Sequence, residues 1–455
     1  MIKELLDSLM FNMKVSNMNI DRISIGGFRN VEKSELIFNH IFALVSLNSY
    51  GKSNLLNGIR FGIDFIKNGS KNKKKMMSNT DYVPLNKKTA SKDYLIELEM
   101  NTTIQNKNYK IIYGYDFKWV RNDNSGAKIN NEWLRIKNDN KNQKYNNYIT
   151  RTEDKAFYRT SESGRCSNKI KIESNELVIN KILAYDSLFY LDIVEKINDL
   201  NMYIERHLDA SFSYKPLPQI IRSDNDDLIQ MDDIFNIPRV IYYMKKQYPD
   251  KFEMLKDSFM LLFPSIININ VSELDKKEEI DENQKIGVEF KIDDDLPLKL
   301  VNQIYSLEVI DENINQPINF DSISDGAKRV FLILTSILLA DIRGYSLIAI
   351  EEPENSVHPA LLQKYLQIIS QFSVDCKVII TSHSPYILQY INPQNIYIGI
   401  PNANGIAKFS RIRQSSQKII SNDAKKSGVS VGDYIFELLS GADNDIESLS
   451  GYLED

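Results

Sequence analysis

Two adjacent glutamates follow an apolar run of the sequence, and their position suggests chemistry. Ser346–Ile350 predicts a buried strand, and Glu351 and Glu352 come directly after it, before a turn at Pro353. Open α/β sheets bind ligands at the carboxyl ends of their parallel strands. Two neighbouring carboxylates repel each other, so the pair indicates a bound cation or a catalytic duty. Many strands end in acidic residues, so this interpretation depends on other segments of the chain.

A Gly-Lys-Ser loop lies upstream. His40–Val45 predicts a strand, Ser46–Ser53 (SLNSYGKS) a loop and Asn54–Ile66 a helix, which is the order that a phosphate-binding loop requires. Lys52 would neutralise the β- and γ-phosphates, and the Ser53 hydroxyl would bind Mg²⁺. The predicted nucleotide contacts in this loop are Asn48, Ser49, Tyr50, Gly51, Lys52, Ser53 and Asn54. Ser46 replaces the first glycine of the motif, which predicts a strained loop or modest affinity. The alternative is a chance Gly-Lys-Ser in an ordinary loop.

Two more segments complete a set of four. Ser324-Asp325-Gly326 comes just before the apolar run Phe331–Ala340, which predicts a buried helix. The three residues are either an ordinary helix cap or a set of N–H donors. In the second case they would contact the γ-phosphate of a nucleotide that another protomer binds. His383 follows the predicted strand Cys376–Ile380. A lone histidine is usually structural, but the handedness and adjacency of βαβ units place this one beside Glu352.

With these motifs in order, the chain resembles the ABC-type ATPase heads of the RecF, SMC and OLD group within the P-loop NTPases. The matching segments are SLNSYGKSNLL, ISDGAKR, SLIAIEEPE, ENSVHP and TSHSP, together with the opening hairpin Ile23–Ile37. The resemblance implies ATP and Mg²⁺ as cofactors and Glu352 and His383 as the catalytic residues. It also implies that Ser53 and Glu351 bind the metal, although most of the family has Asp at the Glu351 position. Ser324, Gly326 and Lys328 would contact nucleotide on an opposing protomer.

The composition fits a globular ATPase with an inserted lobe. The chain has 455 residues, 42% of them hydrophobic and 26% charged, with a formal net charge of −5 that argues against general electrostatic binding of nucleic acid. The two cysteines, Cys166 and Cys376, lie far apart, which suits a reducing compartment and argues against a zinc site. We find no secretory leader and no apolar run long enough to span a bilayer, and therefore expect a cytoplasmic protein without membrane contact.

The expected fold is α/β, a P-loop NTPase of the ABC-ATPase head type with an antiparallel β-subdomain and a mostly helical inserted lobe. The expected domains are 1–165 (Walker A and β-subdomain), 166–300 (inserted lobe), 301–420 (signature, Walker B, D-loop and switch histidine) and 421–455 (tail helix). Strands are expected at 94–100, 110–120 and 132–136 and within 265–300, and helices at 180–207, 237–263 and 430–439. The basic run Lys67–Lys75 is expected to be a solvated loop, with phosphate contact as the alternative. The acidic segments 223–227 and 293–295, and the pair Asp443 and Asp445, are expected to be exposed links or turns.

Two classes of function compete. The first is an anti-phage defence ATPase, similar to the ATPase components of systems such as PARIS. It would form a homodimer or higher homo-oligomer through its nucleotide sites and control a separately encoded effector, such as a TOPRIM-type nuclease. The effector would dock on the inserted lobe or on the tail helix near Tyr434–Leu439. The alternative is a RecF-like DNA-maintenance ATPase that clamps DNA, which the weak basic character of the chain does not favour. A third alternative is a nucleotide-binding scaffold without turnover, and Glu352 argues against it.

Overall fold

The computed structural model of the protein describes residues 18–39, 41–84, 86–121, 125–139, 143–206, 210–214, 219–222, 236–274, 298–301, 304–355, 357–373, 376–400, 404–441 and 443–454. The chain divides into two compact units, and each is described by itself. The first comprises residues 1–204, 344–352 and 374–455, and the second comprises 205–343 and 353–373. The domain boundaries predicted from the sequence stay a prediction.

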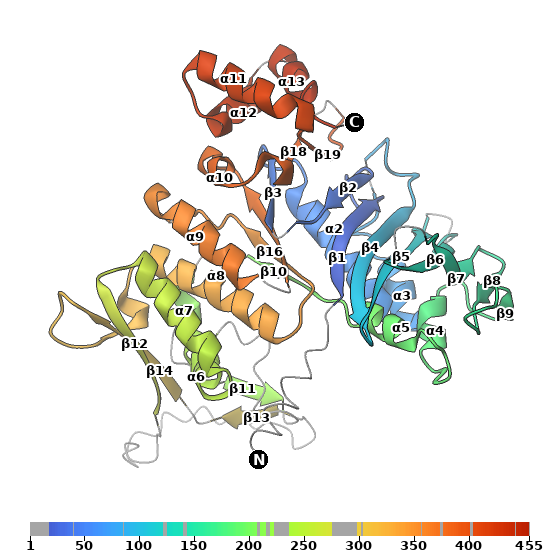
Figure 1. Ribbon diagram of the computed structural model, residues 1–455, viewed down its shortest axis with the longest axis horizontal. Helices are drawn as coiled ribbons and strands as arrows, with labels where there is room; N and C mark the ends of the chain where they lie inside the picture. Colours follow the sequence, from blue (N-terminus) through green and yellow to red (C-terminus); the bar gives the residue numbers. More distant parts are fainter. Residues whose placement is uncertain are drawn as a thin grey trace. The chain divides into compact units, whose positions relative to one another are not determined.

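The first unit contains a mostly parallel sheet and an antiparallel sheet (Figure 1). The parallel sheet has the strand order β10-β16-β17-β3-β18-β19. Its strands are β3 (Ile41–Ser46), β10 (Met202–Glu205), β16 (Leu347–Glu351), β17 (Lys377–Ser382), β18 (Ile396–Gly399) and β19 (Phe409–Arg411). Four of them, β16, β17, β3 and β18, run parallel, and β19 is antiparallel to β18. Short apolar strands buried on both faces are typical of such a sheet.

The antiparallel sheet has the order β2-β1-β4-β5-β6-β7-β8-β9 and confirms the predicted β-subdomain. Its strands are β1 (Asn19–Gly26), β2 (Ser34–Ile37), β4 (Tyr94–Ile104), β5 (Lys107–Lys118), β6 (Lys128–Asn138), β7 (Asn146–Arg151), β8 (Ala156–Tyr158) and β9 (Asn168–Ile170). Buried and partly exposed residues alternate along β4, as expected for a sheet with one face on the core.

Helix α2 (Lys52–Lys67) packs on this sheet through two glycines. Gly58 and Gly62 are one turn apart and so lie on the same side of the helix. The hydroxyls of Tyr94 and Tyr115 donate hydrogen bonds to the carbonyls of Gly58 (2.9 Å) and Gly62 (2.7 Å). A Cβ on Gly62 would overlap the Tyr94 hydroxyl, so this close approach requires glycine.

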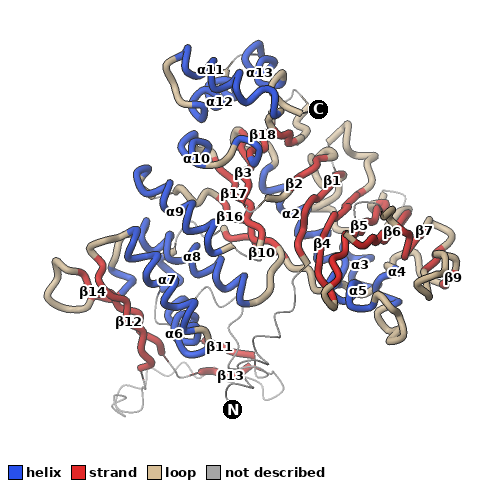
Figure 2. Tube along the Cα trace, viewed as in Figure 1, coloured by secondary structure: helices blue, strands red, loops and turns tan. Residues whose placement is uncertain are grey.

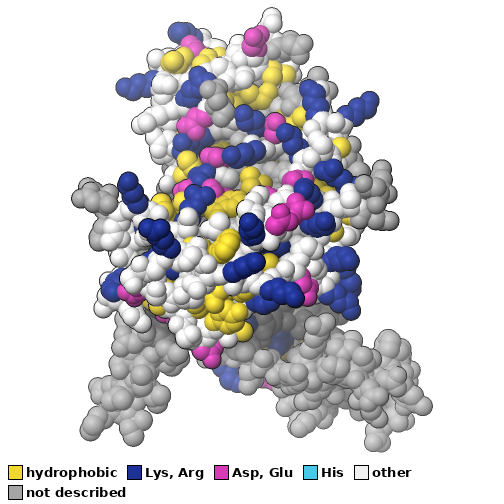
Figure 3. All heavy atoms as spheres, turned by 90° about the vertical axis from the view of Figure 1, so that its right-hand side faces the viewer, with side chains coloured by type: hydrophobic (Ala, Val, Ile, Leu, Met, Phe, Trp, Pro, Cys, Tyr) yellow, Lys and Arg dark blue, Asp and Glu magenta, His cyan; other side chains and the backbone are white. Residues whose placement is uncertain are grey.

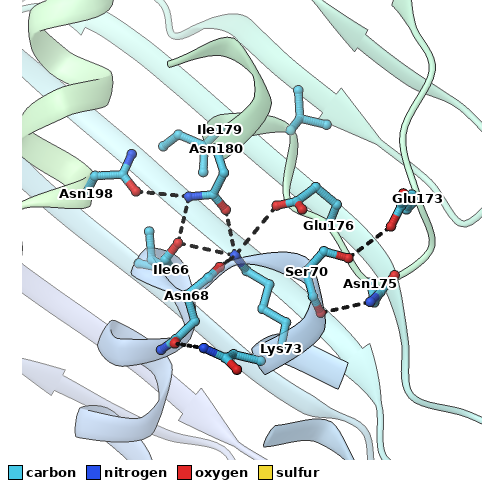
Figure 4. Close-up of polar contacts among 12 residues, drawn as sticks. Ile66, Asn68, Ser70, Lys73, Glu173, Asn175, Glu176, Ile179, Asn180 and Asn198 are labelled. Atoms are coloured by element: carbon cyan, nitrogen blue, oxygen red, sulfur yellow. Dashed lines mark hydrogen bonds and ion pairs between the residues drawn. The ribbon is translucent and has the colours of Figure 1, made fainter. Parts of the chain in front are cut away.

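The basic run after α2 differs from its prediction. It forms helix α3 (Ser70–Met77), in which Lys71, Lys74 and Lys75 are exposed but Lys73 is fully buried. The Lys73 ammonium donates to Asn180 Oδ1 (2.7 Å) and to the carbonyls of Asn68 and Ile66, and it lies 3.8 Å from Glu176 Oε1 (Figure 4). The predicted solvated loop is therefore wrong, because one lysine of the run ties α2 and α3 to helix α4 (Val178–Ile182).

The segment 180–207 is only partly helical. It contains the end of α4, helix α5 (Leu191–Asn198) and then strand β10, which lies next to β16 at the edge of the parallel sheet. The Asn201 carbonyl accepts hydrogen bonds from the N–H groups of Ser346 and Leu347. Three- and four-residue spacing of apolar residues does not by itself distinguish a helix from a short edge strand.

The C-terminal part of the first unit is helical. It contains α10 (Pro385–Tyr390), α11 (Gln417–Ser427), α12 (Val431–Ser440) and α13 (Asp443–Ser450). Helix α12 confirms the predicted tail helix, with the Ser430 hydroxyl as its N-cap. Its apolar residues Ile435, Leu438 and Leu439 are buried, so the predicted docking face near Tyr434–Leu439 is wrong. The predicted turn at Asp443 and Asp445 is also wrong, since both residues lie in α13.

The described part of the second unit contains the α-helices α6 (Ile237–Gln247), α7 (Pro249–Leu262), α8 (Asp325–Ile342) and α9 (Pro359–Phe372), shown in blue in Figure 2. Its strands are β11 (Gln219–Arg222), β12 (Ile266–Leu274), β13 (Leu298–Val301), β14 (Ile304–Asp311) and β15 (Ile318–Asn319). Phe320 and Phe331 pack at a ring-centroid distance of 4.6 Å and anchor the start of α8. The predicted acidic links 223–227 and 293–295 lie outside the described residues. The predicted α/β architecture with an antiparallel β-subdomain and a mostly helical lobe is confirmed.

Candidate nucleotide site

The register of the parallel sheet brings the predicted motifs to one edge. Glu351 pairs with Thr381 across β16 and β17, Ser382 pairs with Val45 across β17 and β3, and Gly399 pairs with Ser46 across β18 and β3. All four strands run in the same direction, so their carboxyl ends meet there. The Gly-Lys-Ser loop, the two glutamates and His383 therefore leave the sheet side by side.

The loop between β3 and α2 has the backbone of an anion-binding turn. Ser49 has a φ of 60° and Gly51, the N-cap of α2, has a φ of 116°. No side chain caps the N-terminus of α2, and Asn48, Ser49 and Ser53 are exposed. A Cβ on Gly51 would lie 2.6 Å from the Ala407 Cβ, so both the backbone angle and the packing require glycine. An uncapped helix N-terminus with exposed flanking residues suits a phosphate.

Lys52 is buried and is held by the loop itself. Its ammonium donates to the Ser46 carbonyl (3.0 Å), the Ser46 hydroxyl (3.2 Å) and the Leu47 carbonyl (3.4 Å). The predicted strain at Ser46 is wrong, since Ser46 ends β3 and its φ is not positive. The left-handed residues of the loop are Ser49 and Gly51 instead, and only Ser49 carries a side chain. Ser46 therefore replaces the first glycine of the motif without backbone strain and supplies two oxygens to Lys52.

Two other loop residues have side chains that serve packing. Tyr50 is buried against Phe409, and burial raises the pKa of Tyr50 to about 12. The Asn54 amide accepts from Arg29 Nη1 (2.8 Å) and donates to Asn30 Oδ1 (2.8 Å). Side-chain contacts from Tyr50 or Asn54 to a nucleotide are thus not favoured, although both were predicted as nucleotide-binding.

The bend Arg29-Asn30 was missed as a part of this site. Arg29 has a φ of 49°, and its Nε donates to the Asp81 carbonyl (2.9 Å), while Asn30 Nδ2 donates to the Gly405 carbonyl (3.0 Å). The contacts of both residues with Asn54 fix the bend against the first turn of α2. The only sequence signal was the segment Phe28-Arg29-Asn30 at a predicted hairpin bend, and it does not show that the bend folds back onto the loop.

The carboxylates and the histidine form a connected group with Lys52. Glu352 has a φ of 51°, and its N–H donates to the Thr381 carbonyl (2.8 Å), which continues the β16–β17 ladder. His383 Nε2 lies 3.4 Å from Glu352 Oε1, and His383 Nδ1 lies 3.3 Å from Lys52 Nζ. A non-glycine residue in the left-handed region costs free energy and is characteristic of functional sites. The predicted proximity of Glu352 and His383 is present.

The electrostatics favour a neutral His383. Burial and the Lys52 ammonium lower the pKa of His383, and they outweigh the effects of Glu352 and of a backbone hydrogen bond with Ser46. An ammonium group only donates, so a hydrogen bond from Lys52 Nζ to His383 Nδ1 requires the tautomer with its proton on Nε2, the nitrogen that faces Glu352. In that tautomer the neutral ring contacts Lys52 through Nδ1 and Glu352 through Nε2.

The donor set fits Mg²⁺ bound together with a nucleotide. Ser53 offers an exposed hydroxyl and Glu351 a partly exposed carboxylate at the same sheet edge. In the part of the chain that the structure describes, no three His, Cys, Asp or Glu residues cluster as metal ligands. Mg²⁺ at nucleotide sites typically uses one or two protein oxygens, phosphates and water, so such a cluster is not needed.

The signature segment begins α8 in the second unit. The Ser324 hydroxyl accepts from the Ala327 N–H (3.3 Å), and Ser324 and Gly326 remain accessible. Lys328 is buried, and its ammonium contacts Asp325 Oδ1 (2.9 Å), the Asp321 carbonyl (3.1 Å) and the Ser211 hydroxyl (3.2 Å). This geometry favours a structural role for Lys328, whereas Ser324 and Gly326 can still contact a ligand.

Comparisons with known proteins place the chain in a family. Residues 41–389 match the sequence profile of the family described as "AAA domain, putative AbiEii toxin, Type IV TA system". No match to a curated protein was found. Among described residues, no helix is long and apolar enough to cross a membrane.

Three of the similar solved structures are head domains of SMC proteins. One is a head bound to the C-terminal winged-helix domain of ScpA, at 12% identity and a TM-score of 0.46, with 89% of this chain and 99% of that chain covered. The head from Thermotoga maritima has 10% identity and a TM-score of 0.38, with 87% and 99% covered. The head whose ScpA partner derives from Pyrococcus furiosus has 13% identity and a TM-score of 0.44, with 90% and 100% covered. The family match extends over both units and includes the Gly-Lys-Ser loop, Glu352 and His383. The chain is therefore a member of this AAA domain family, and it is an ATPase with a P-loop NTPase fold.

Proposed function

We propose that this protein hydrolyses ATP at composite sites formed by two copies of the chain and uses the resulting assembly to control a separately encoded effector in anti-phage defence. The observation that supports hydrolysis best is the contact series Lys52–His383–Glu352 at the sheet edge. It connects Lys52, the cation predicted to bind the phosphates, to the Glu352 carboxylate, which would accept a proton from water.

In this proposal each residue has one task. Lys52 leaves its oxygen partners on Ser46 and Leu47 to contact the β- and γ-phosphates, and the N–H groups at the start of α2 bind the same phosphates. Bound Mg²⁺ would balance phosphate charge. Ser53 and Glu351 would hold the metal, either directly or through water. Glu352 orients and deprotonates the attacking water, and neutral His383 contacts the γ-phosphate.

The opposing copy would complete the site with Ser324 and Gly326. Both residues stand at the start of α8, where backbone N–H groups can meet a γ-phosphate. Within its own unit, Ser324 already caps α8, so its hydroxyl is held in place. A composite site of this kind makes assembly depend on ATP.

Complementation tests the composite site. Glu352→Gln and Ser324→Arg each place one defect in every site of a homodimer, so each variant alone should be inactive. A mixed dimer has one intact site, and random mixing should restore about a quarter of wild-type turnover. No restored activity, with both variants folded and able to form mixed dimers, would contradict the composite site. Wild-type turnover by Glu352→Gln alone would instead contradict the catalytic role of Glu352.

Two observations support the effector role. The matched family's description names a toxin and a type IV TA system, which favours a place in a multi-component system. In the second unit, Phe212, Leu261 and Ile267 are apolar and exposed. We propose these residues as effector contacts, since aromatic and aliphatic side chains anchor protein interfaces. Leu261→Asp should abolish co-purification of the neighbouring gene's product without changing ATP turnover.

The RecF-like alternative predicts duplex DNA binding that ATP strengthens. The exposed lysines of α3 are its candidate contacts, and buried Lys73 is excluded from them. Salt-sensitive binding of duplex DNA that disappears when Lys71, Lys74 and Lys75 are changed to Gln would favour this alternative. ATP turnover that is indifferent to duplex DNA would favour the defence role.

A further inference from the structure

A cavity of about 590 Å³ lies on the eight-stranded sheet of the first unit. Its described lining residues come from β4 to β7, from the loop after β8 and from the start of α5, and none of them belongs to the Gly-Lys-Ser loop. The volume is within the range of small-molecule sites. The proposed ATPase mechanism makes no use of this cavity.

Aromatic rings form one wall. Tyr148, Phe189 and Tyr190 contact one another at centroid distances of 5.7 Å (Tyr148–Phe189), 5.1 Å (Phe189–Tyr190) and 4.9 Å (Tyr148–Tyr190). Tyr190 is 3% exposed, whereas Phe189 remains 38% exposed. Buried Tyr190 and partly buried Tyr148 therefore hold the exposed Phe189 ring in position, which leaves a surface on which another flat ring can stack.

A buried guanidinium supports the same wall. Arg159 is 8% exposed and lies 4.9 Å from the Tyr148 ring centroid and 5.9 Å from that of Phe189. It donates hydrogen bonds to the Ser161 carbonyl (3.0 Å) and to the Glu162 carbonyl. These hydrogen bonds hold the guanidinium against the rings, and its positive charge lies within this wall of the cavity.

Lysines from the strands supply the remaining charge. Lys107, Lys137 and Lys144 line the cavity, and the Lys137 ammonium lies 4.7 Å from the Tyr145 ring centroid. Glu162 and Asp192 are the acidic lining residues, so the described lining carries a net positive charge. The side of the molecule that carries β7 to β9 shows lysine and arginine side chains interspersed with apolar patches (Figure 3).

We propose that this cavity binds a nucleoside phosphate, with the base stacked on Phe189 and the phosphate held by Lys107 and Lys137. Stacking on an aromatic ring beside a cationic groove is how proteins bind unpaired nucleotides without reading their sequence. The ligand is either a free nucleotide or a nucleotide within a single-stranded nucleic acid, since both present the same base and phosphate. This site is separate from the ATPase site and does not depend on it.

The test uses the full chain with Lys52→Ala, so that binding at the Gly-Lys-Ser loop is removed. Two fluorescent probes, adenosine monophosphate and a short single-stranded oligothymidylate, are titrated by anisotropy. We expect at least one probe to bind, and we expect Phe189→Ala to weaken its binding about tenfold. Lys137→Gln should weaken binding. It should also reduce the slope of log affinity against log salt concentration by about one, the value for one phosphate contact. The exposed aromatic Tyr386→Ala and the exposed lysine Lys128→Gln are matched controls and should have no effect.

The two probes identify the source of the ligand. Binding of adenosine monophosphate at least as tight as that of the oligonucleotide indicates a free nucleotide, and much tighter binding of the oligonucleotide indicates a single-stranded nucleic acid. The proposal is overturned if neither probe binds, or if Phe189→Ala and Lys137→Gln both leave binding unchanged. In the wild-type background Phe189→Ala should leave ATP turnover intact, so a failure here is distinct from a failure of the ATPase mechanism.

Discussion

Lys73 should make the stability of the first unit depend on alkaline pH. Its ammonium is fully buried among carbonyl oxygens, the Asn180 amide and Glu176 (Figure 4). Burial lowers the pKa of Lys73 from its ordinary 10.5 to about 8 in the folded protein. In the unfolded chain the pKa returns to its ordinary value, so the unfolded state binds more protons between these two pH values.

The sign and size follow from this difference. Where the unfolded state binds more protons, the free energy of unfolding rises with pH. Between pH 7 and pH 9 the two pKa values give a gain of about 1.3 kcal/mol, and the limiting gain above both values is about 3.4 kcal/mol. Lys73→Met keeps the length of the side chain and removes the titration. The wild-type protein should therefore gain about 1.3 kcal/mol over Lys73→Met between pH 7 and pH 9.

Urea unfolding measured by tryptophan fluorescence reports on the first unit, which contains Lys73. The protein has two tryptophans, Trp119 and Trp133, and both lie in the first unit, close to or within the eight-stranded sheet. Lys74→Met is the matched control, because Lys74 is exposed on the same helix and should show no such pH dependence. If the difference in the free energy of unfolding between the wild-type protein and Lys73→Met stays constant from pH 7 to pH 9, the reasoning is refuted.

Three further predictions concern the P-loop and its helix. Gly62→Ala should lower the free energy of unfolding by about 1–3 kcal/mol in the same urea assay, because a Cβ there overlaps the Tyr94 hydroxyl, whereas Gly69→Ala has open space and should change little. Ser49→Gly should keep or increase ATP affinity in an equilibrium titration, because Ser49 has the left-handed backbone, and Ser46→Gly should give no such gain. Tighter ATP binding by Ser46→Gly than by Ser49→Gly would contradict this account of the loop. Lys52→Ala should abolish ATP binding in the same titration while Lys67→Ala, at the other end of α2, should not; retained binding in Lys52→Ala would exclude Lys52 as the phosphate cation.

The arrangement of the sheet edge could be predicted from the sequence because parallel strands constrain it strongly. Apolar runs of five or six residues, separated by helices, leave few orders for β3, β16 and β17, and their carboxyl ends must lie together. The proximity of Glu352 and His383 follows from that rule. Their contact with Lys52 required only that the loop fold back over the same edge.

Individual side chains were harder to predict, because their burial depends on distant segments. Lys73 reads as one more lysine in a basic run, and its burial depends in part on Asn180 of α4, which lies more than a hundred residues later in the chain. Tyr50 reads as a loop residue until β19 provides Phe409 to cover it. The left-handed backbone at Ser49 was assigned to Ser46, because a motif position does not state which residue carries a positive φ.

The most direct test of the central claim is ATP hydrolysis by Glu352→Gln under single-turnover conditions, with ATP binding measured in parallel. The account predicts that hydrolysis falls by about 10²–10⁴-fold, the usual contribution of a general base, while ATP remains bound and the assembly persists. The amide keeps the size of the side chain but cannot accept a proton from water. Hydrolysis near the wild-type rate, with ATP bound normally, would contradict the assignment of Glu352 as the catalytic base.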